Sequence, residues 1–494
     1  MSSLADRLRS VVRPHEGRPE GRPLREDASD LSTDGRGGPS GRPDDSPAEI
    51  LGGEWRELRG ERFLVIERKY PPGHRHGHVA VADTLPPDEG CWSRFPLLDG
   101  SAARIPPDGR MLFLDLETTG IAGGAGTYAF LVGLAWYQDG CLRVRQFFLS
   151  NFAAERVLLE AVADVADRCG AVVTYNGKSF DLPLIDTRFQ LHRLETPFTG
   201  MPHVDMLHPA RCLWRRDDTP SGEPTLVRRS DRRNAVKAFR QTGREGGCRL
   251  TALEHTLCGH VREGDVPGFE IPSRYFHFVR TGDPRGLAAV MEHNRLDLVS
   301  LAMLTARASQ LLEDGPATAR TGREALGMGR LYERAGMTVA ARAAFLRAAE
   351  YREADTVMAG PPRLVPGLGG TCPTASVCAE AWRAYAVLSR RERRFADAAH
   401  GWRRILELGQ CPPAIQREAS EALAVHHEHR LRDLQAARAF ALQSLTVNST
   451  RSRHEATQHR LARLDRKLDG AGHHGHEEFG HKGHKEPQRE LFSL

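Results

Sequence analysis

The chain lacks the features that mark membrane, secreted and cysteine-rich zinc proteins. Its 494 residues contain no apolar stretch of about 18 residues, the length that spans a bilayer. No segment resembles a signal peptide. The nine cysteines form no CxxC pair and are scattered through expected strands and helices, which favours reduced thiols over a disulfide framework or a zinc site. We therefore expect a soluble, cytoplasmic protein with no membrane partner.

The chain also lacks a strong net charge, and its N-terminal segment lacks aromatic residues. The net charge of +5 permits nucleic-acid binding without requiring it. Residues 1–50 have almost no aromatic content and are rich in Arg, Pro, Gly, Asp and Ser, so they cannot bury enough apolar surface to order themselves. We expect a disordered arm there. Residues 51–110 contain short strand-like runs and are expected to form an accessory N-terminal segment, a layer on the domain that follows.

Two carboxylates stand two residues apart at the end of an apolar run. Asp115 and Glu117 belong to the segment Leu-Asp-Leu-Glu-Thr-Thr-Gly at 114–120 and lie at the end of an expected strand over 111–116. A strand sends residues i and i+2 to the same face, so the two side chains project together. Two anions this close need neutralisation, most simply by a divalent metal. A solvated loop edge is the alternative.

Two later segments favour the metal. Residues 172–185 run from an apolar strand through a polar turn into an expected helix, with Asp181 near its first turn, where a carboxylate is favoured by the helix N-terminus. Residues 290–301 form an expected amphipathic helix in which His293 and Asp297, four positions apart, share one face.

The order Asp115, Glu117, Asp181 and Asp297, with a histidine one turn before the last, resembles the DEDD-type 3'-5' exonucleases and, more narrowly, the YprB-type ribonuclease H-like domain family. The resemblance covers roughly residues 111–308 and includes segments 204–211, 250–255 and 265–275. It implies an α/β fold, an RNase H-like mixed sheet flanked by helices. In one departure, His293 has the spacing from Asp297 that the tyrosine subclass gives its aromatic residue.

The resemblance also implies the site. Asp115 would bridge two Mg²⁺ or Mn²⁺ ions, Glu117 and Asp297 would hold the ion that activates water, and Asp181 would support the second. Such ions supply a nucleophile and stabilise the leaving oxygen. His293 would orient or deprotonate the attacking water. The expected substrate-binding residues are Thr118, Asn176, Asn294, Arg228, Arg229, Arg232 and Arg233.

The four arginines lie in an arginine-rich stretch at 211–249. We expect them to contact backbone phosphates, which dominate nucleic-acid affinity; a solvated charged surface is the equal alternative.

Two other patterns are weaker. Gly177-Lys178-Ser179 imitates a phosphate-binding loop, but the glycine expected five residues earlier is Val172. His74, His76 and His78 alternate as chelating residues would, although an exposed loop is the favoured interpretation because no firm fourth ligand is nearby.

The remaining chain is expected to be helical. After a nuclease domain at 111–320, residues 321–468 contain three expected helical hairpins at 325–350, 379–408 and 417–445, with Ala341, Ala398 and Ala437 in comparable places. They resemble degenerate tetratricopeptide repeats; a plain bundle is nearly as favoured. The nuclease domain is expected to fold without them. Residues 469–494 form a His-rich, low-complexity tail.

These patterns together favour a metal-dependent 3'-5' exonuclease acting on single-stranded nucleic-acid ends, with DNA favoured over RNA. The alternative from another class is a nucleic-acid-binding adaptor that recruits a partner such as a helicase through its helical repeats. A structure-specific endonuclease on the same metal centre is a third option. Sugar preference stays open because it depends on a few contacts to the 2'-hydroxyl.

Overall fold

The computed structural model describes residues 47–85, 95–100, 110–120, 126–215, 248–351, 374–408, 411–445 and 451–474. The chain divides into two compact units, 1–45 and 46–494, and all of these residues belong to the second. Residues 1–46 of the expected disordered arm, the four arginines of the basic stretch and most of the His-rich tail lie outside the described residues, whereas residues 47–50 of that arm are helical.

A seven-stranded mixed sheet forms the N-terminal half, in the order β1-β2-β7-β6-β5-β8-β9. β5 pairs antiparallel with β6 and parallel with β8, and β8 pairs parallel with β9. The strands are β1 Glu54–Leu58, β2 Glu61–Tyr70, β5 Met111–Thr118, β6 Ala129–Gln138, β7 Cys141–Phe148, β8 Ala171–Thr174 and β9 His203–Asp205, and a separate two-stranded ribbon pairs β3 Arg75–His76 with β4 Val79–Ala80. The expected mixed sheet is confirmed.

The apolar run before the two carboxylates becomes a central strand. A strand covered on both faces needs apolar side chains on both, and β5 meets this need by alternation. Met111 and Phe113 enter a core cluster with the later part of α10, whereas Leu112 and Leu114 enter a second cluster with α4 and α9. Continuing this alternation, Asp115 and Glu117 face the α10 side.

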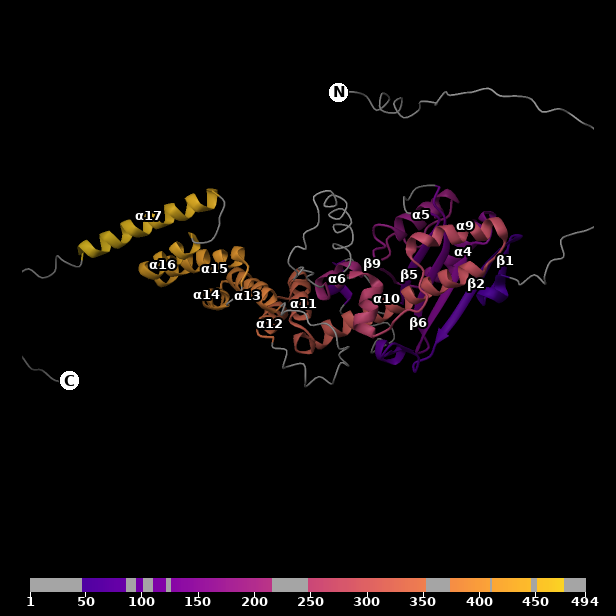
Figure 1. Cartoon of the computed structure of the whole chain (residues 1–494), viewed down its shortest axis with the longest axis horizontal. Coiled ribbons are helices and arrows are strands. Elements are labelled where there is room, and N and C mark those ends of the chain that lie inside the picture. Colours follow the sequence, from indigo (N-terminus) through magenta and orange to yellow (C-terminus); the bar gives the residue numbers. More distant parts are fainter. Residues whose placement is uncertain are drawn as a thin grey trace, which may run out of the picture. The chain divides into compact units, whose positions relative to one another are not determined.

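Helices cover both faces of the sheet. Helices α4, α5 and α9 lie together over the strands (Figure 1). The helices of this half are α2 Pro47–Leu51, α3 Phe95–Leu98, α4 Glu155–Ala166, α5 Asp181–Leu191, α6 Leu207–Leu213, α8 Leu250–Leu253, α9 Ile271–Thr281 and α10 Ala288–Asp314. None of the described helices is long and apolar enough to cross a membrane.

Residues 51–70 contain the expected strand-like runs, but these strands join the central sheet and do not form a separate layer on it. β2 pairs antiparallel with β7, and β1 pairs with β2. Both strands therefore extend the central sheet. The four consecutive residues 63–66 of β2 are all buried, which is typical of a strand packed on both faces.

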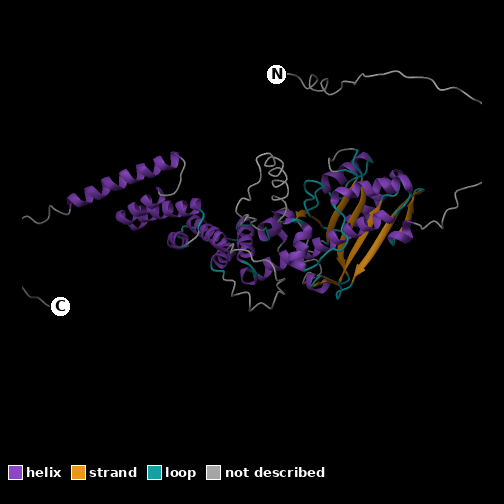
Figure 2. Cartoon of the chain, viewed as in Figure 1, coloured by secondary structure: helices purple, strands orange, loops and turns teal. Residues whose placement is uncertain are grey.

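The chain after α10 is helical wherever it is described, as expected (Figure 2). Its helices are α11 Gly322–Arg334, α12 Thr338–Ala349, α13 Thr374–Arg391, α14 Phe395–Glu407, α15 Pro413–His426, α16 Leu434–Leu445 and α17 Arg451–His474. Ala341, Ala398 and Ala437 are buried, each at the same place near the start of α12, α14 and α16. The likeness to tetratricopeptide repeats stays a prediction.

The helical region shares a core with the half of the chain that holds the sheet. α11 packs on α6, where Trp214 Nε1 donates to Glu324 Oε1 over 2.9 Å. A Cβ atom at Gly327 would lie 2.2 Å from the carbonyl oxygen of Cys212. One apolar cluster runs from Phe113 through α10 to Phe345 and Trp382. A chain cut at residue 320 would therefore lose part of this apolar cluster.

Candidate active site

Asp115 and Glu117 lie on one side of β5, opposite Gly133 and Leu131 of β6. The pairing shifts register between Glu117 and Thr118, so the strand bends directly after the second carboxylate. Thr118 is half-buried there, and its hydroxyl donates to the carbonyl of Gly120 over 2.9 Å. Its expected contact with substrate stays a prediction.

A buried amide chain holds Asp115 in place. The Asn294 side chain donates to Asp115 Oδ2 over 2.8 Å, and Gln146 donates to Asn294 Oδ1 over 2.8 Å. Asn294 is fully buried, because it packs where Gly133 has no side chain. An Asn294 contact with substrate does not fit this burial. Its amide instead orients the carboxylate.

Asp181 begins α5, after a turn that Asp205 organises. The buried Asp205 carboxylate, at the end of β9, accepts from the backbone N–H groups of Asn176 and Lys178 over 2.7 and 3.1 Å. Asn176 has a φ of +69°, a left-handed conformation that asparagine tolerates better than most residues. The expected role of Asn176 in substrate binding stays a prediction. Asp205 was not among the expected site residues.

The pKa shifts indicate that the four carboxyl groups lie close to one another. Burial raises the pKa of Asp115 well above its usual range, and the charges of Asp297, Glu117 and Asp181 raise it further. Burial likewise raises the pKa of Glu117, followed by the effects of Asp297 and Asp181. The pKa of Asp181 rises to about 7, first through burial and then through Asp205 and Asp297. Strand β5 and helices α5 and α10 therefore place four interacting anions at one site.

His293 and Asp297 have partners from one loop. His293 Nδ1 lies 2.6 Å from Asp265 Oδ1, and His293 Nε2 lies 3.7 Å from Asp297 Oδ2. Arg262 donates through Nη2 to Asp297 Oδ1 over 2.6 Å and through Nε to Glu254 Oε2 over 2.6 Å. Arg262, Glu254 and Asp265 were not among the expected site residues, although the last two lie in segments that resemble the family.

The alternating histidines 74, 76 and 78 do not form an exposed loop as a whole, so this prediction was wrong for His76. Its side chain is 3% exposed and its Nε2 lies 3.1 Å from Ser300 Oγ of α10. Tertiary packing against α10 buries it. The sequence could not indicate this because Ser300 lies 224 positions away.

Comparison with known proteins agrees with this geometry. Residues 112–309 match the family described as RNase_H superfamily. The chain is also 32% identical over 245 residues to "Uncharacterized protein YprB" of Bacillus subtilis (strain 168), a match that covers 49% of this chain and 52% of that protein. The chain therefore matches about half the length of this curated relative.

Proposed function

From the membership of residues 112–309 in the RNase H superfamily, we propose that the protein is a metal-dependent 3'-5' exonuclease that hydrolyses phosphodiester bonds at single-stranded nucleic-acid ends, with DNA favoured over RNA. One observation carries the proposal. Burial and the charge of Asp297 raise the pKa of Asp115, of Glu117 and of Asp181, and Asp181 also raises the pKa of both residues of β5, so four carboxyl groups from three elements lie close together.

The donor set fits hard divalent cations. Four carboxylates offer only oxygen ligands, the type that Mg²⁺ and Mn²⁺ prefer. Burial first, and then the neighbouring carboxylates, raise the pKa of Asp115 and of Glu117, so a bound cation would stabilise their charged forms. Asp115 would bridge the two ions, Glu117 and Asp297 would hold one, and Asp181 would support the other. Divalent ions held there would supply an activated water and stabilisation of the leaving oxygen.

We propose that His293 takes a proton from the attacking water. With Nδ1 against Asp265, its Nε2 is directed toward Asp297. A carboxylate that accepts the Nδ1 proton fixes the tautomer, so that Nε2 is the nitrogen that accepts a second proton. His293 would act as a general base, and Asp265 would position it.

The basic stretch would add phosphate contacts. Arg228, Arg229, Arg232 and Arg233 are proposed to hold the substrate backbone. Replacing all four with alanine should weaken binding and reduce the log-log salt slope by about 0.7 for each lost contact on a single strand. A salt slope equal to that of the unmodified protein would show that the stretch makes no phosphate contacts.

The central test is Asp115→Asn, which removes the bridging charge with little change in volume. We expect hydrolysis of end-labelled oligonucleotides to fall by several orders of magnitude, because charge stabilisation at the metal centre is lost. The panel should include linear and circular, single- and double-stranded DNA and RNA. Full turnover by folded Asp115→Asn would exclude this site, and cleavage of circles would favour the endonuclease.

One contact favours a nucleic-acid-binding adaptor instead. Arg262 already neutralises Asp297, which an enzyme must share with a metal ion. An adaptor would bind single strands with equal affinity before and after Asp115→Asn and would release no nucleotide under any divalent cation.

A further inference from the structure

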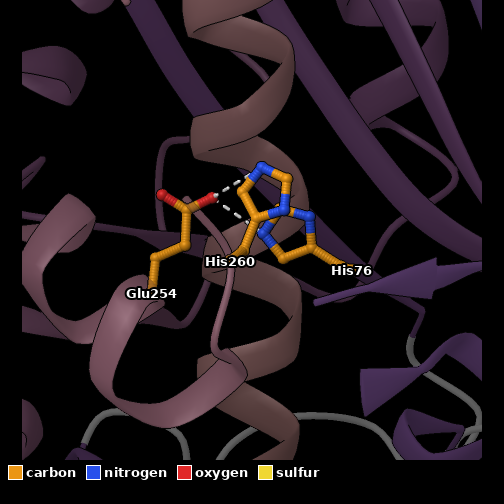
Figure 3. A group of neighbouring side chains, drawn as sticks. All are labelled: His76, Glu254 and His260. Atoms are coloured by element: carbon orange, nitrogen blue, oxygen red, sulfur yellow. Dashed lines mark ion pairs between the residues drawn. The ribbon is translucent and has the colours of Figure 1, made fainter. Parts of the chain in front are cut away.

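A second group of ligating side chains lies beside the carboxylates. His76 on β3, Glu254 at the start of the π-helical turn η5 Glu254–Cys258, and His260 in the next loop each offer one ligand atom, and these atoms all lie within 4.8 Å of one another. Both imidazoles point toward the same carboxylate oxygen (Figure 3). His76 Nε2 lies 2.8 Å from Glu254 Oε1, and His260 Nε2 lies 4.0 Å from it.

The two oxygens of Glu254 have different surroundings. Oε2 accepts from Arg262 over 2.6 Å. Oε1 is buried and lies 2.8 Å from His76 Nε2, without the alignment of a good hydrogen bond. A carboxylate side chain that is only 1% exposed needs a donor or a cation close to each oxygen. A cation bound between Oε1 and the two imidazoles would meet this need.

The donor set indicates which cation. Two imidazole nitrogens and one carboxylate oxygen suit Zn²⁺ or a similar transition ion, and they differ from the all-oxygen ligands that Mg²⁺ prefers. The stacked rings of His76 and His260, with centroids 4.1 Å apart, hold both nitrogens on one side. His260 is 28% exposed and His76 3%, so solvent reaches the group from the His260 side.

We propose that His76, Glu254 and His260 form a transition-metal site with the preferences of Zn²⁺, separate from the carboxylate site. The bound ion would tie the β3–β4 ribbon to the loop 260–265. That loop carries Arg262 and Asp265, the partners of Asp297 and His293. The ion would therefore fix their positions. This positioning role rests on the proposed nuclease function; the binding of the ion does not.

The test uses the full chain, stripped with a chelator and then dialysed against Zn²⁺ or Co²⁺. Wild type and His78→Ala should retain one more ion per chain than His260→Ala and His76→Ala, and Co²⁺ should give a tetrahedral visible spectrum in the first pair alone. His78 is the matched control because it lies two residues from His76 and is exposed. The His-rich tail is common to all four proteins, so its binding cancels in the difference.

Thermal unfolding supplies a second readout. Zn²⁺ should raise the melting temperature of wild type and His78→Ala and leave that of His260→Ala unchanged. Because His260 is partly exposed, this variant should fold even if His76→Ala does not. Equal metal content, equal Co²⁺ spectra and equal Zn²⁺ shifts in wild type and His260→Ala would overturn the proposal and leave the three residues as a metal-free polar network. Neither readout uses nuclease activity, so this failure is separable from failure of the proposed function.

Discussion

Asp265 controls which nitrogen of His293 faces the carboxylates. Its oxygen lies 2.6 Å from Nδ1, so Nε2 is left for the reaction. We expect Asp265→Asn to lower kcat by about 10- to 100-fold, the usual effect of losing a partner of this kind, with little change in KM. Steady-state kinetics on a single-stranded oligonucleotide would measure both.

The matched control is Glu263→Gln, which removes the same charge from an exposed side chain two residues away. It should leave kcat unchanged. Equal losses in the two variants would show that general charge, and not the contact with His293, matters.

Asp181 gives the metal-free protein a pH-dependent stability. Its pKa is about 7 in the fold, against an ordinary value of 3.8. The folded state thus binds more protons between these values, so stability must fall as the pH rises through this window. Asp181→Asn removes this pH-dependent loss of folding stability and should stabilise the metal-free protein at pH 7 by up to about 4 kcal/mol.

Thermal unfolding from pH 4 to 8 in chelator would measure the gap between wild type and Asp181→Asn. It should be small near pH 4, widen toward pH 7, and narrow when Mg²⁺ or Mn²⁺ is added. A gap that is constant with pH would show that Asp181 does not titrate in this window.

Spacing on a strand and two helices, together with the resemblance to the exonucleases, led to the prediction of the four carboxylates and His293. Asp205 and Asp265 lie in segments that resemble the family but have no spacing that marks them as site residues, and Arg262 lies outside those segments. Arg262 meets Asp297 from 35 positions away, and a charged loop residue has no periodicity that would reveal its partner. Burial of Asn294 was equally hidden, since it depends on the missing side chain of Gly133 on another element.

At the scale of elements, α10 approaches β6 closely at one glycine. A Cβ atom at Gly133 would lie 2.3 Å from Asn294 Oδ1. Gly133→Ala should therefore push Asn294 away from Asp115. We expect this substitution to destabilise the fold by about 1–3 kcal/mol. It should also reduce hydrolysis, although glycine has no side chain that could take part in the reaction. Denaturant unfolding and nuclease assays would measure the two effects.

Gly286→Ala serves as the control, because a Cβ atom there meets nothing within 4 Å. It should change neither quantity. Full activity in Gly133→Ala would mean that Asn294 does not position Asp115.

Element positions followed well from hydrophobic pattern. The predicted strand at 111–116 is β5 at 111–118, and the predicted hairpins match α11 to α16. The pattern could not show which strands pair. Strand β2 pairs with the edge of β7, and the contact between Glu67 and Arg145 joins residues 78 positions apart. Local periodicity does not indicate which distant strands pair.

At the scale of the whole molecule, the shared core argues against an independent nuclease domain. A chain ending at residue 320 exposes the face of α6 that α11 covers. We expect it to aggregate, whereas a chain ending at 474, which keeps every described helix after α10, should stay monodisperse. Size-exclusion chromatography and thermal unfolding would compare them.

Both shortened chains keep all four carboxylates. If the chain ending at 320 is monodisperse and as active as the longer one, the nuclease half folds alone, as its sequence pattern suggested, and the helical region serves another task.

The long separation between β5 and α10 also sets the timing of synthesis. Asp115 and Asn294 are 179 positions apart, so a ribosome working at 5–20 residues per second needs roughly 10 to 35 s to make the second after the first. Until α10 emerges, the growing chain holds an acidic strand without its partner helix. A nascent chain that is released before residue 297 is added lacks Asp297. Under the proposed function, such an incomplete chain would have no complete hydrolytic site while it is near its messenger RNA.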